Sequence, residues 1–316
     1  MEDRLFKFAK LVDAGSFTKA AALLHISQPA LSTAISKLER ELRTTLILRG
    51  TRPLKLTPSG EAAYAHAKET AVRTSNLKLQ IAATAQEKVA LRIGMIDSLA
   101  NALFERDQGL SRLEQQASVS FVVDNSRYLV NAVARDDIDI AFVVEQKQHH
   151  DTLRAEPIGT EPLMLVCHHT LVARTQQALA DGTLPNFISY DEHSNTFRLV
   201  RHALAVQHVS IQPTFYSTSP EVIRKLVIAQ KGTAALPYLM VRDLIAQGLL
   251  ATIPLNSSAV MPRPVQFVRH RDKVLPEPLT QVAAQLKGIL QELMAGALSN
   301  TQVVNHSTKH RILMAG

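Results

Sequence analysis

The chain has 316 residues and a formal net charge of +7 at pH 7, and 46% of its residues are hydrophobic. This length suits two or three domains, and the apolar content excludes a disordered or collagen-like chain. No apolar run reaches the roughly 20 residues that cross a bilayer, and the first residues do not form a secretory leader. We therefore expect no membrane partner. Cys167 is the single cysteine, so we also expect no intramolecular disulfide and a cytoplasmic location.

The positive charge is concentrated near the beginning of the chain. Residues 1–60 hold ten Lys/Arg and five Asp/Glu, and the rest of the chain is close to neutral. A basic head joined to a near-neutral body predicts a module that binds a polyanion and carries a second function. A basic, solvated surface without a partner is the alternative that composition leaves open.

The basic head is expected to contain three short helices. Apolar residues recur at helical spacing from Leu5, and Gly15 ends this first helix. Thr18 is placed to cap a second helix, and Ser27 to cap a third with Pro29 in its first turn. A tight turn joins the last two helices, which is the layout of a helix-turn-helix.

The outward face of the third helix carries polar and cationic groups suited to base edges and phosphates. Gln28 is the best-placed base reader, because a carboxamide can form two hydrogen bonds with adenine. In this region we predict DNA contacts from Thr18, Ser27, Gln28, Pro29, Ser32, Thr33, Ser36, Lys37 and Arg40. A solvated helix face that touches nothing is the alternative interpretation.

A hairpin and a long helix follow. Residues 45–56 form two apolar runs around a Gly/Pro turn, and Arg49 and Arg52 flank the tip, where a wing reaches a minor groove or phosphates. Residues 61–87 contain no proline or glycine and predict a helix of roughly 40 Å. Such a helix usually pairs with another, which indicates a dimer contact; packing on its own chain is the alternative.

The head resembles the winged helix-turn-helix of LysR-type transcriptional regulators. The matching residues are Gly15-Ser16-Phe17-Thr18-Lys19-Ala20-Ala21, Leu24 to Ser32, Ile35, Leu38-Glu39, Leu42, Arg49 and Leu56-Thr57-Pro58-Ser59-Gly60. Arg43 departs from the family's usual helix-ending glycine, and Ile47 from its usual aromatic residue. The resemblance implies a homodimer or homotetramer that binds an imperfect inverted repeat in double-stranded promoter DNA, with RNA polymerase as a further partner.

The body of the chain alternates strands and helices. Strands are expected at residues 90–96, 120–123, 138–144, 162–166, 187–190, 214–217, 234–236 and 264–268, and helices at 221–230 and 279–293. This order predicts βαβ units with a parallel sheet, whose ligands bind at the carboxyl ends of the strands.

The body is similar to the effector domain of LysR-type regulators, in which two Rossmann-like α/β lobes enclose a cleft as in type 2 periplasmic binding proteins. Residues 161–163, 226–237 and 248–250 carry the match. The implied organisation is a DNA-binding domain at 1–60, a linker and dimerisation helix at 61–88, an effector-binding domain at 89–300 and a tail at 301–316. Lobe I comprises 89–160 and 265–300, and lobe II comprises 161–264.

The resemblance, together with polar groups that follow the strands, also implies an effector pocket. Its expected members are Ser98, Asn125, Ser126, Asn195, Thr196, Phe197 and Thr218. They suit a small polar effector; a carboxylate on it would pair with Arg127 or Arg198. Helix capping is the alternative role for the residues at strand ends, and a surface position is the alternative for the two arginines.

Signatures of enzyme chemistry are missing from the sequence. There is no Walker A, G-x-G-x-x-G, G-x-S-x-G or H-E-x-x-H pattern, and the adjacent pairs His149-His150 and His168-His169 point to different sides of an extended segment. We therefore predict no catalytic residues, no cofactor and no metal site, and interpret the chain as an effector-controlled, sequence-specific transcription regulator. The alternatives are a constitutive architectural DNA binder whose body only oligomerises, and an enzyme on a binding-protein scaffold.

Overall fold

The computed structural model describes residues 1–48, 50, 53–84, 90–105, 113, 115–146, 151–255 and 260–313. The chain forms two compact units. Unit 1 contains Met1–Glu87 with the short segments Arg135–Asp137 and Asp272–Pro276, and unit 2 contains Lys88–Ala134, Ile138–Arg271 and Glu277–Gly316. None of the helices in the described ranges is both long and apolar enough to span a bilayer.

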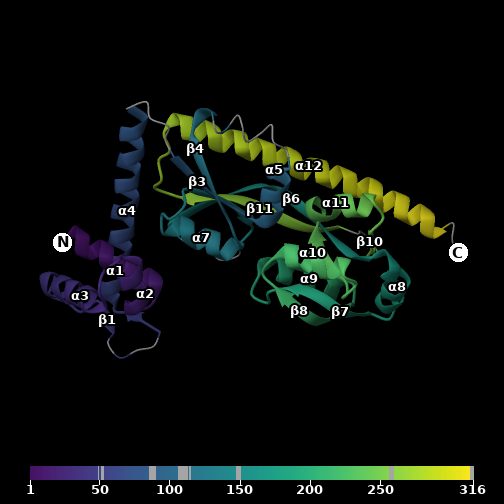
Figure 1. Ribbon diagram of the computed structural model, residues 1–316, viewed down its shortest axis with the longest axis horizontal. Coiled ribbons are helices and arrows are strands. Elements are labelled where there is room, and N and C mark those ends of the chain that lie inside the picture. Colours follow the sequence, from purple (N-terminus) through teal and green to yellow (C-terminus); the bar gives the residue numbers. More distant parts are fainter. Residues whose placement is uncertain are drawn as a thin grey trace. The chain divides into compact units, whose positions relative to one another are not determined.

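Unit 1 is a cluster of helices with a short hairpin (Figure 1). Its elements are α1 (Glu2–Ala14), α2 (Phe17–Leu23), α3 (Gln28–Leu42), β1 (Ile47–Leu48), β2 (Lys55–Leu56) and α4 (Pro58–Thr84). β1 and β2 pair antiparallel, with Ile47 opposite Leu56, which confirms the predicted hairpin. Arg49 and Arg52 lie outside the described residues.

Local capping chemistry sets the ends of the first three helices. Gly15 ends α1 in the left-handed region at φ 65°, and the Ser27 hydroxyl accepts a hydrogen bond from the Ala30 amide at the start of α3. The prediction that Thr18 caps α2 is wrong, because α2 begins at Phe17 and Ser16 occupies the N-cap position. Arg43 follows α3 at φ 52°, so a side chain here adopts the backbone conformation that glycine favours.

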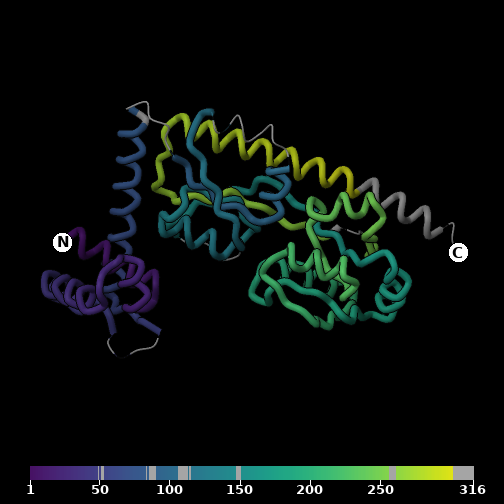
Figure 2. Tube along the Cα trace, viewed as in Figure 1, coloured from purple at the N-terminus to yellow at the C-terminus, as the bar shows by residue number. Residues whose placement is uncertain are grey.

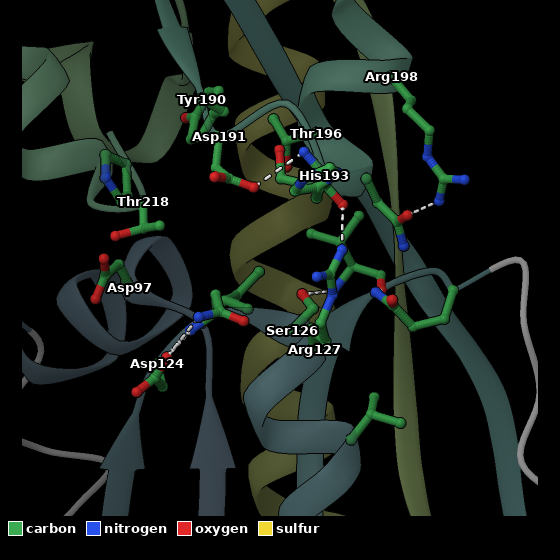
Figure 3. Close-up of a pocket in the computed structure, with 18 of the residues that line it drawn as sticks. Asp97, Asp124, Ser126, Arg127, Tyr190, Asp191, His193, Thr196, Arg198 and Thr218 are labelled. Atoms are coloured by element: carbon green, nitrogen blue, oxygen red, sulfur yellow. Dashed lines mark hydrogen bonds between the residues drawn. The ribbon is translucent and has the colours of Figure 1, made fainter. Parts of the chain in front are cut away.

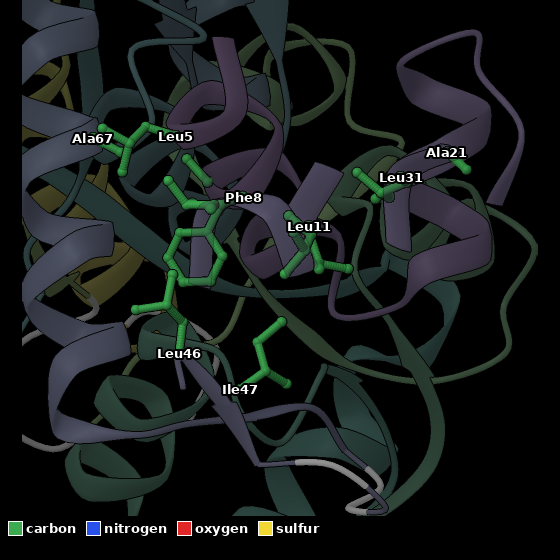
Figure 4. Packing of buried hydrophobic residues seen from close by; sticks show 12 residues of the cluster. Leu5, Phe8, Leu11, Ala21, Leu31, Leu46, Ile47 and Ala67 are labelled. Atoms are coloured by element: carbon green, nitrogen blue, oxygen red, sulfur yellow. The ribbon is translucent and has the colours of Figure 1, made fainter. Parts of the chain in front are cut away.

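The three-helix core packs against the hairpin and the beginning of α4. The side chains of Phe8, Leu11, Leu31, Leu38 and Leu46 are completely buried in this cluster (Figure 4). The apolar stripe of α3 therefore faces inward and leaves the opposite face of that helix outside.

The long helix α4 is fixed to α1 by polar contacts. The Tyr64 hydroxyl donates to Asp13 Oδ1 at 2.6 Å, and Lys68 Nζ donates to Asp13 Oδ2 at 3.1 Å. Burial raises the pKa of the Tyr64 phenol and lowers the pKa of the Lys68 ammonium. The first half of α4 thus packs on its own chain, whereas Leu77 and Ile81 near its other end are exposed.

Unit 2 is an α/β structure. Its first elements, through the strand that connects lobe I to lobe II, are β3 (Ala90–Met95), α5 (Asp97–Phe104), β4 (Ser118–Val123), α7 (Ser126–Ala134), β5 (Ile140–Val144) and β6 (Leu153–His168). The following elements are η1 (His169–Leu171), α8 (Val172–Ala180), β7 (Thr183–Tyr190), α9 (Asn195–Val206), β8 (Ser210–Ser217), α10 (Pro220–Ile228), β9 (Ala234–Pro237), α11 (Tyr238–Ala246), β10 (Leu250–Thr252), β11 (Val260–His270) and α12 (Glu277–Leu313).

The main sheet of unit 2 is mixed rather than wholly parallel. Its strand order is β10-β6-β11-β5-β3-β4, with β9 also paired to β6. β3 pairs parallel with β4 and β5, as predicted, but β11 pairs antiparallel with both β5 and β6. The antiparallel part arises because the chain leaves lobe I along β6 and returns along β11, in the opposite direction.

These two crossover strands connect the lobes. β6 spans 16 residues and β11 spans 11, well beyond the short strands expected at 162–166 and 264–268. Figure 2 shows that both lie between the part of unit 2 that contains β3 and β4 and the part that contains β7 and β8, which pair parallel in a sheet of their own. Two lobes joined by two strands form a hinge around a cleft.

Helix α12 lies along one face of the main sheet, and α7 lies on the other face (Figure 1). Gly159 of β6 permits the close approach of α12, because a Cβ there would lie 2.7 Å from the Met294 methyl carbon. α12 continues to Leu313, so the helix expected to end near residue 293 is longer than predicted.

Candidate functional site

The outward face of α3 is open to solvent. The exposed residues at its start and along its length are Ser27, Gln28, Pro29, Ser32, Thr33, Lys37 and Arg40; Ser36 is half-buried, and Thr18 is exposed on the neighbouring α2. The side chains of Lys37 and Arg40 form no hydrogen bond or ion pair within the described part of the chain. The helix therefore presents uncompensated cations and short polar groups on one side and the buried leucines on the other.

A cavity of about 750 Å³ lies in unit 2 (Figure 3). Its lining comes from the first turns of α5, α7, α9 and α10, from the segment that follows β7, and from Arg263 on β11. This volume is within the range of small-molecule sites. The cavity meets the carboxyl ends of β3, β4, β7 and β8, which is where ligands bind in open α/β sheets.

The structure brings most of the predicted pocket residues together at this cavity. The lining contains Ser98, Asn125, Ser126, Asn195, Thr196 and Thr218, as well as Arg127 and Arg198. Phe197 is not among the lining residues. It is buried, and the Arg201 guanidinium lies 5.6 Å from its ring centre, since consecutive helical residues point about 100° apart and Thr196 takes the inward direction.

Several of these polar groups also hold the backbone. Asn125 Oδ1 accepts from the Tyr128 amide at 3.0 Å and caps α7, and Ser126 Oγ accepts from the Val144 amide at 3.1 Å. Ser194 caps α9. Helix capping is therefore an observed role of Asn125, and it fixes the positions of the neighbouring cavity groups.

Two hydrogen bonds span the cavity between the lobes. Arg127, at the start of α7, donates to the His193 carbonyl at 2.8 Å, and Asn195, at the start of α9, donates from Nδ2 to the Glu145 carbonyl at 2.6 Å. Figure 3 shows the Arg127 guanidinium directed toward the His193 backbone. Either bond breaks if the lobes move apart, so both report on closure of the cleft.

A buried ionic cluster forms the floor of the cavity. Arg263 forms an ion pair with Glu161 and donates to Ser98 Oγ at 2.6 Å and to Thr196 Oγ1 at 3.4 Å. Ser98 Oγ in turn donates to Glu161 Oε2 at 3.0 Å. Since Ser98 belongs to α5 and Thr196 to α9, one guanidinium on a crossover strand contacts a helix of each lobe.

The rings of His168 and His169 lie 4.4 Å apart, so the prediction that this pair points to different sides is wrong. His168 Nδ1 is 2.8 Å from Thr170 Oγ1, and Cys167 is completely buried, which raises the pKa of its thiol. His149 and His150 lie outside the described residues. Within the described ranges, no three His, Cys, Asp or Glu side chains are grouped in a way that would hold a metal ion.

Both parts of the chain match known protein families. Residues 3–61 match the bacterial regulatory helix-turn-helix protein, lysR family, and residues 84–291 match the LysR substrate binding domain. The chain belongs to the LysR family of transcriptional regulators. Its function is thus that of a DNA-binding transcription regulator with a substrate-binding domain.

Relatives of this LysR-family regulator extend over most of its length. The HTH-type transcriptional regulator CysL of Bacillus subtilis is 25% identical over 251 residues, which cover 77% of this chain and 83% of CysL. The crystal structure of ArgP from Mycobacterium tuberculosis has a TM-score of 0.62 at 19% identity, covering 91% of this chain and 96% of ArgP. Vibrio fischeri DarR, solved in complex with DNA, has a TM-score of 0.51 at 20% identity, covering 91% and 98%.

Some cavity residues of the LysR-family regulator were not predicted from sequence. They are Asp97, Asp124, Tyr190, Asp191, Glu192, His193 and Arg263. Asp124 and Asp191 directly follow strands and Asp97 follows β3 after one residue, so they could have been found by the same reasoning that selected Ser98 and Asn125. Arg263 lies within a strand between two prolines, and nothing local in the sequence indicates that its side chain turns inward.

The cavity environment changes the acidity of two of these groups. Burial is the main cause that raises the pKa of Asp97, and the carboxylates of Asp124 and Glu221 add to it, while Arg263 acts in the opposite direction. Burial also raises the pKa of Tyr190, so its phenol stays protonated at neutral pH. The Tyr190 hydroxyl has no hydrogen-bond partner among the described residues.

Proposed function

We propose that this LysR-family regulator binds an inverted repeat in promoter DNA sequence-specifically, and that a small molecule in the cavity controls this binding. The observation that carries the proposal is the cavity itself. Its polar groups come from both lobes, and Arg127 and Asn195 bridge it by hydrogen bonds to the opposite lobe. A ligand that competes for or completes these bonds changes the relative stability of open and closed lobes.

The proposed DNA contacts divide into base-reading and phosphate-binding groups. Gln28, Ser32 and Thr33 on the first turns of α3 suit base edges, while Lys37 and Arg40 suit phosphates. The exposure of these side chains and the lack of ion-pair partners for the two cations support this division. From the sequence, Arg49 and Arg52 of the wing are added as phosphate or minor-groove contacts.

The assembly is proposed to be a homodimer or homotetramer in the cytoplasm. The exposed apolar residues Leu77 and Ile81 in the second half of α4 support pairing between two copies of this helix. Two heads joined in this way would occupy the two half-sites of an inverted repeat. We also propose that the DNA-bound regulator contacts RNA polymerase and affects transcription through this contact. The proposal includes no catalytic step.

The effector is proposed to be a small polar molecule. Hydroxyl and amide groups dominate the cavity beside Arg127, whose guanidinium retains donors after its bond to the His193 carbonyl. A carboxylate on the effector would find these donors and the first turns of α7 and α9, where backbone N–H groups favour anions.

The test begins with genomic DNA fragments that bind the full chain. A bound fragment is footprinted with and without a library of metabolites sorted into amines, carboxylates and neutral compounds. A footprint that changes with at least one metabolite, and no longer changes in an Arg127→Ala variant, supports the proposal. A footprint that no class of metabolite changes favours a constitutive architectural DNA binder instead.

A further inference from the structure

The charge of the cavity lining is unevenly distributed. The described lining residues include four carboxylates and three guanidinium groups, but Arg263 is already neutralised by the buried Glu161 beneath it. Arg127 and Arg198 donate to neutral oxygens, the His193 carbonyl and the Asn195 side chain. The carboxylates therefore outnumber the cations available to them.

Two of the unpaired carboxylates, Asp97 and Asp124, lie together on one side of the cavity, whereas Asp191 lies after β7 in the other lobe. Asp97, Asp124 and Asp191 form no ion pair with any residue of the described part of the chain. Figure 3 shows Asp97 and Asp124 together below Thr218, apart from Arg198 on the opposite side of the cavity. The pKa of Asp97 is raised partly by Asp124 and Glu221, which means that negative charge at this position is under-compensated.

A separate observation at the same cavity is a buried hydroxyl group without a hydrogen-bond partner. Tyr190 lines the cavity and is only 7% exposed, yet its hydroxyl has no hydrogen-bond partner among the described residues. The charges of Arg263 and Glu161 act on the pKa of this phenol more strongly than the charge of Asp97, so the phenol lies by the ionic cluster at the floor and within range of Asp97. Leaving a buried hydroxyl unpaired costs about 1–3 kcal/mol, and a ligand N–H or carboxyl group would satisfy it.

Helix ends oppose this charge only in part. A helix N-terminus is equivalent to roughly half a positive charge. α5 begins at Asp97, and α7 begins two residues after Asp124, so each carboxylate has one such end beside it. Two full carboxylates outweigh these two half charges. In the other lobe, the first turn of α9 lies near the Arg127 guanidinium and favours an anion. The cavity is thus polarised, with an acidic side and a basic side.

We infer that the effector carries a primary ammonium group, which binds between Asp97 and Asp124 and near the Tyr190 hydroxyl. This inference rests on the proposed function and specifies its ligand class. The ammonium donates to the two carboxylates, and an anionic group at the other end of the same molecule extends toward Arg127. The effector is therefore an amphoteric amine rather than a simple organic acid.

A matched set of five-carbon probes tests this class. Thermal unfolding of the full chain is measured with 5-aminopentanoate, 1,5-diaminopentane and glutarate, which exchange ammonium for carboxylate at the ends of similar chains. We expect 5-aminopentanoate to raise the Tm most, 1,5-diaminopentane to raise it less and glutarate to have the least effect, because ligand that binds only folded protein stabilises it.

The acidic residues are tested with matched variants. Asp97→Asn and the double variant Asp97→Asn/Asp124→Asn should lower the affinity for 5-aminopentanoate at least about tenfold, since each removes a charge-assisted hydrogen bond. Asp181→Asn removes a carboxylate that is outside the cavity lining and should leave the ligand-induced Tm shift unchanged. Each shift is compared with the same variant without ligand, so a change in intrinsic stability does not affect the result.

Three results would overturn the inference: a glutarate shift as large as that of 5-aminopentanoate, no shift with any probe, or a shift that persists in the double variant. These results are separable from failure of the proposed function. If the footprint responds only to carboxylates, the regulator is effector-controlled but its effector is not an amine. If it responds to no metabolite, effector control itself fails.

Discussion

Glu161 and Arg263 lie directly opposite each other on the antiparallel crossover strands β6 and β11, and their side chains form a buried ion pair. Through Ser98 and Thr196, Arg263 also contacts the first turns of α5 and α9. The pair therefore lies on the hinge strands, beneath the cavity and between the lobes. Its energetics should affect both the stability of unit 2 and the geometry of the cleft.

Removing one member of this pair should be strongly destabilising. Arg263→Met leaves the Glu161 carboxylate buried without its partner, and we expect a loss of about 3–5 kcal/mol in the free energy of unfolding of unit 2. Calorimetry of the full chain measures the effect. The double variant Glu161→Leu/Arg263→Met should recover much of this loss, because neither charge is then left alone. A double variant no more stable than the single one would contradict this account.

The cationic face of α3 leads to a prediction about salt dependence. Lys37→Ala should weaken binding to all DNA sequences about equally and reduce the slope of log K against log salt by about 1, because one phosphate contact releases about one counterion. Gln28→Ala should instead relax the choice of base. Binding titrations at several salt concentrations distinguish the two. An unchanged slope in Lys37→Ala would remove this residue from the phosphate contacts.

Gly60 is predicted to be irreplaceable in the head. A Cβ at this position would lie 2.1 Å from the Leu46 carbonyl oxygen, and Leu46 also accepts the Thr57 amide at 3.0 Å. Gly60→Ala must therefore displace the hairpin, and we expect it to destabilise unit 1 by about 2 kcal/mol or more.

The matched control for Gly60→Ala is the same substitution at Gly296, where the added methyl group meets no neighbour. Gly296 is exposed on α12, and a Cβ there would meet nothing within 4 Å. Gly296→Ala should stabilise the helix by about 0.5–1 kcal/mol. Chemical denaturation of both variants tests the contrast; equal effects would show that the contact with Leu46 does not restrict residue 60.

Asp97 predicts a pH-dependent effect on stability. Its folded pKa is raised above the ordinary 3.8, with burial, Asp124 and Glu221 as causes and Arg263 opposing them. The stability that depends on the protonated carboxyl is fully present below the unfolded pKa and is lost as the pH rises through the folded pKa. Asp97→Asn should therefore raise the Tm at pH 7 by about 1–2 °C, less than burial alone would suggest because the group is only half-buried.

The Asp97→Asn variant should show no increase in Tm at pH 3.5, where Asp97 is largely protonated in both folded and unfolded protein. Scanning calorimetry of the ligand-free full chain at the two pH values measures the difference. A gain that is equal at both pH values would mean that packing of the amide, rather than removal of charge, is responsible.

The helix-turn-helix could be predicted from the sequence because its determinants are local. Gly15 ends a helix and Ser27 caps one through atoms within a few residues of each other, and the spacing of the leucines in α3 decides which face is buried. The failed prediction for Thr18 is of the same local kind, since Ser16 and Thr18 are both capable N-cap residues and the helix begins between them, at Phe17.

The polar groups at the strand ends were likewise accessible from the order of strands and helices. Ser98, Asn125 and Ser126 reach one cavity because the parallel strands β3 and β4 bring their carboxyl ends to the same edge. Thr196 reaches it from the separate sheet of the second lobe. The division of the body into two lobes was predicted from the resemblance to the LysR family. The inward direction of Thr196 rather than Phe197 depends on how α9 is rotated about its axis, which the packing against lobe II determines.

The sequence by itself determined the basic head, the reading helix, the order of the α/β body and most of the polar groups at the cleft. Only the tertiary structure decided the charge of that cleft. Glu161 and Arg263 are about a hundred residues apart, and the antiparallel pairing of β6 with β11 brings them into contact. Because that contact holds Arg263 in an ion pair with Glu161, no cation in the described part of the chain forms an ion pair with Asp97 or Asp124, and no local pattern in the chain contains this information.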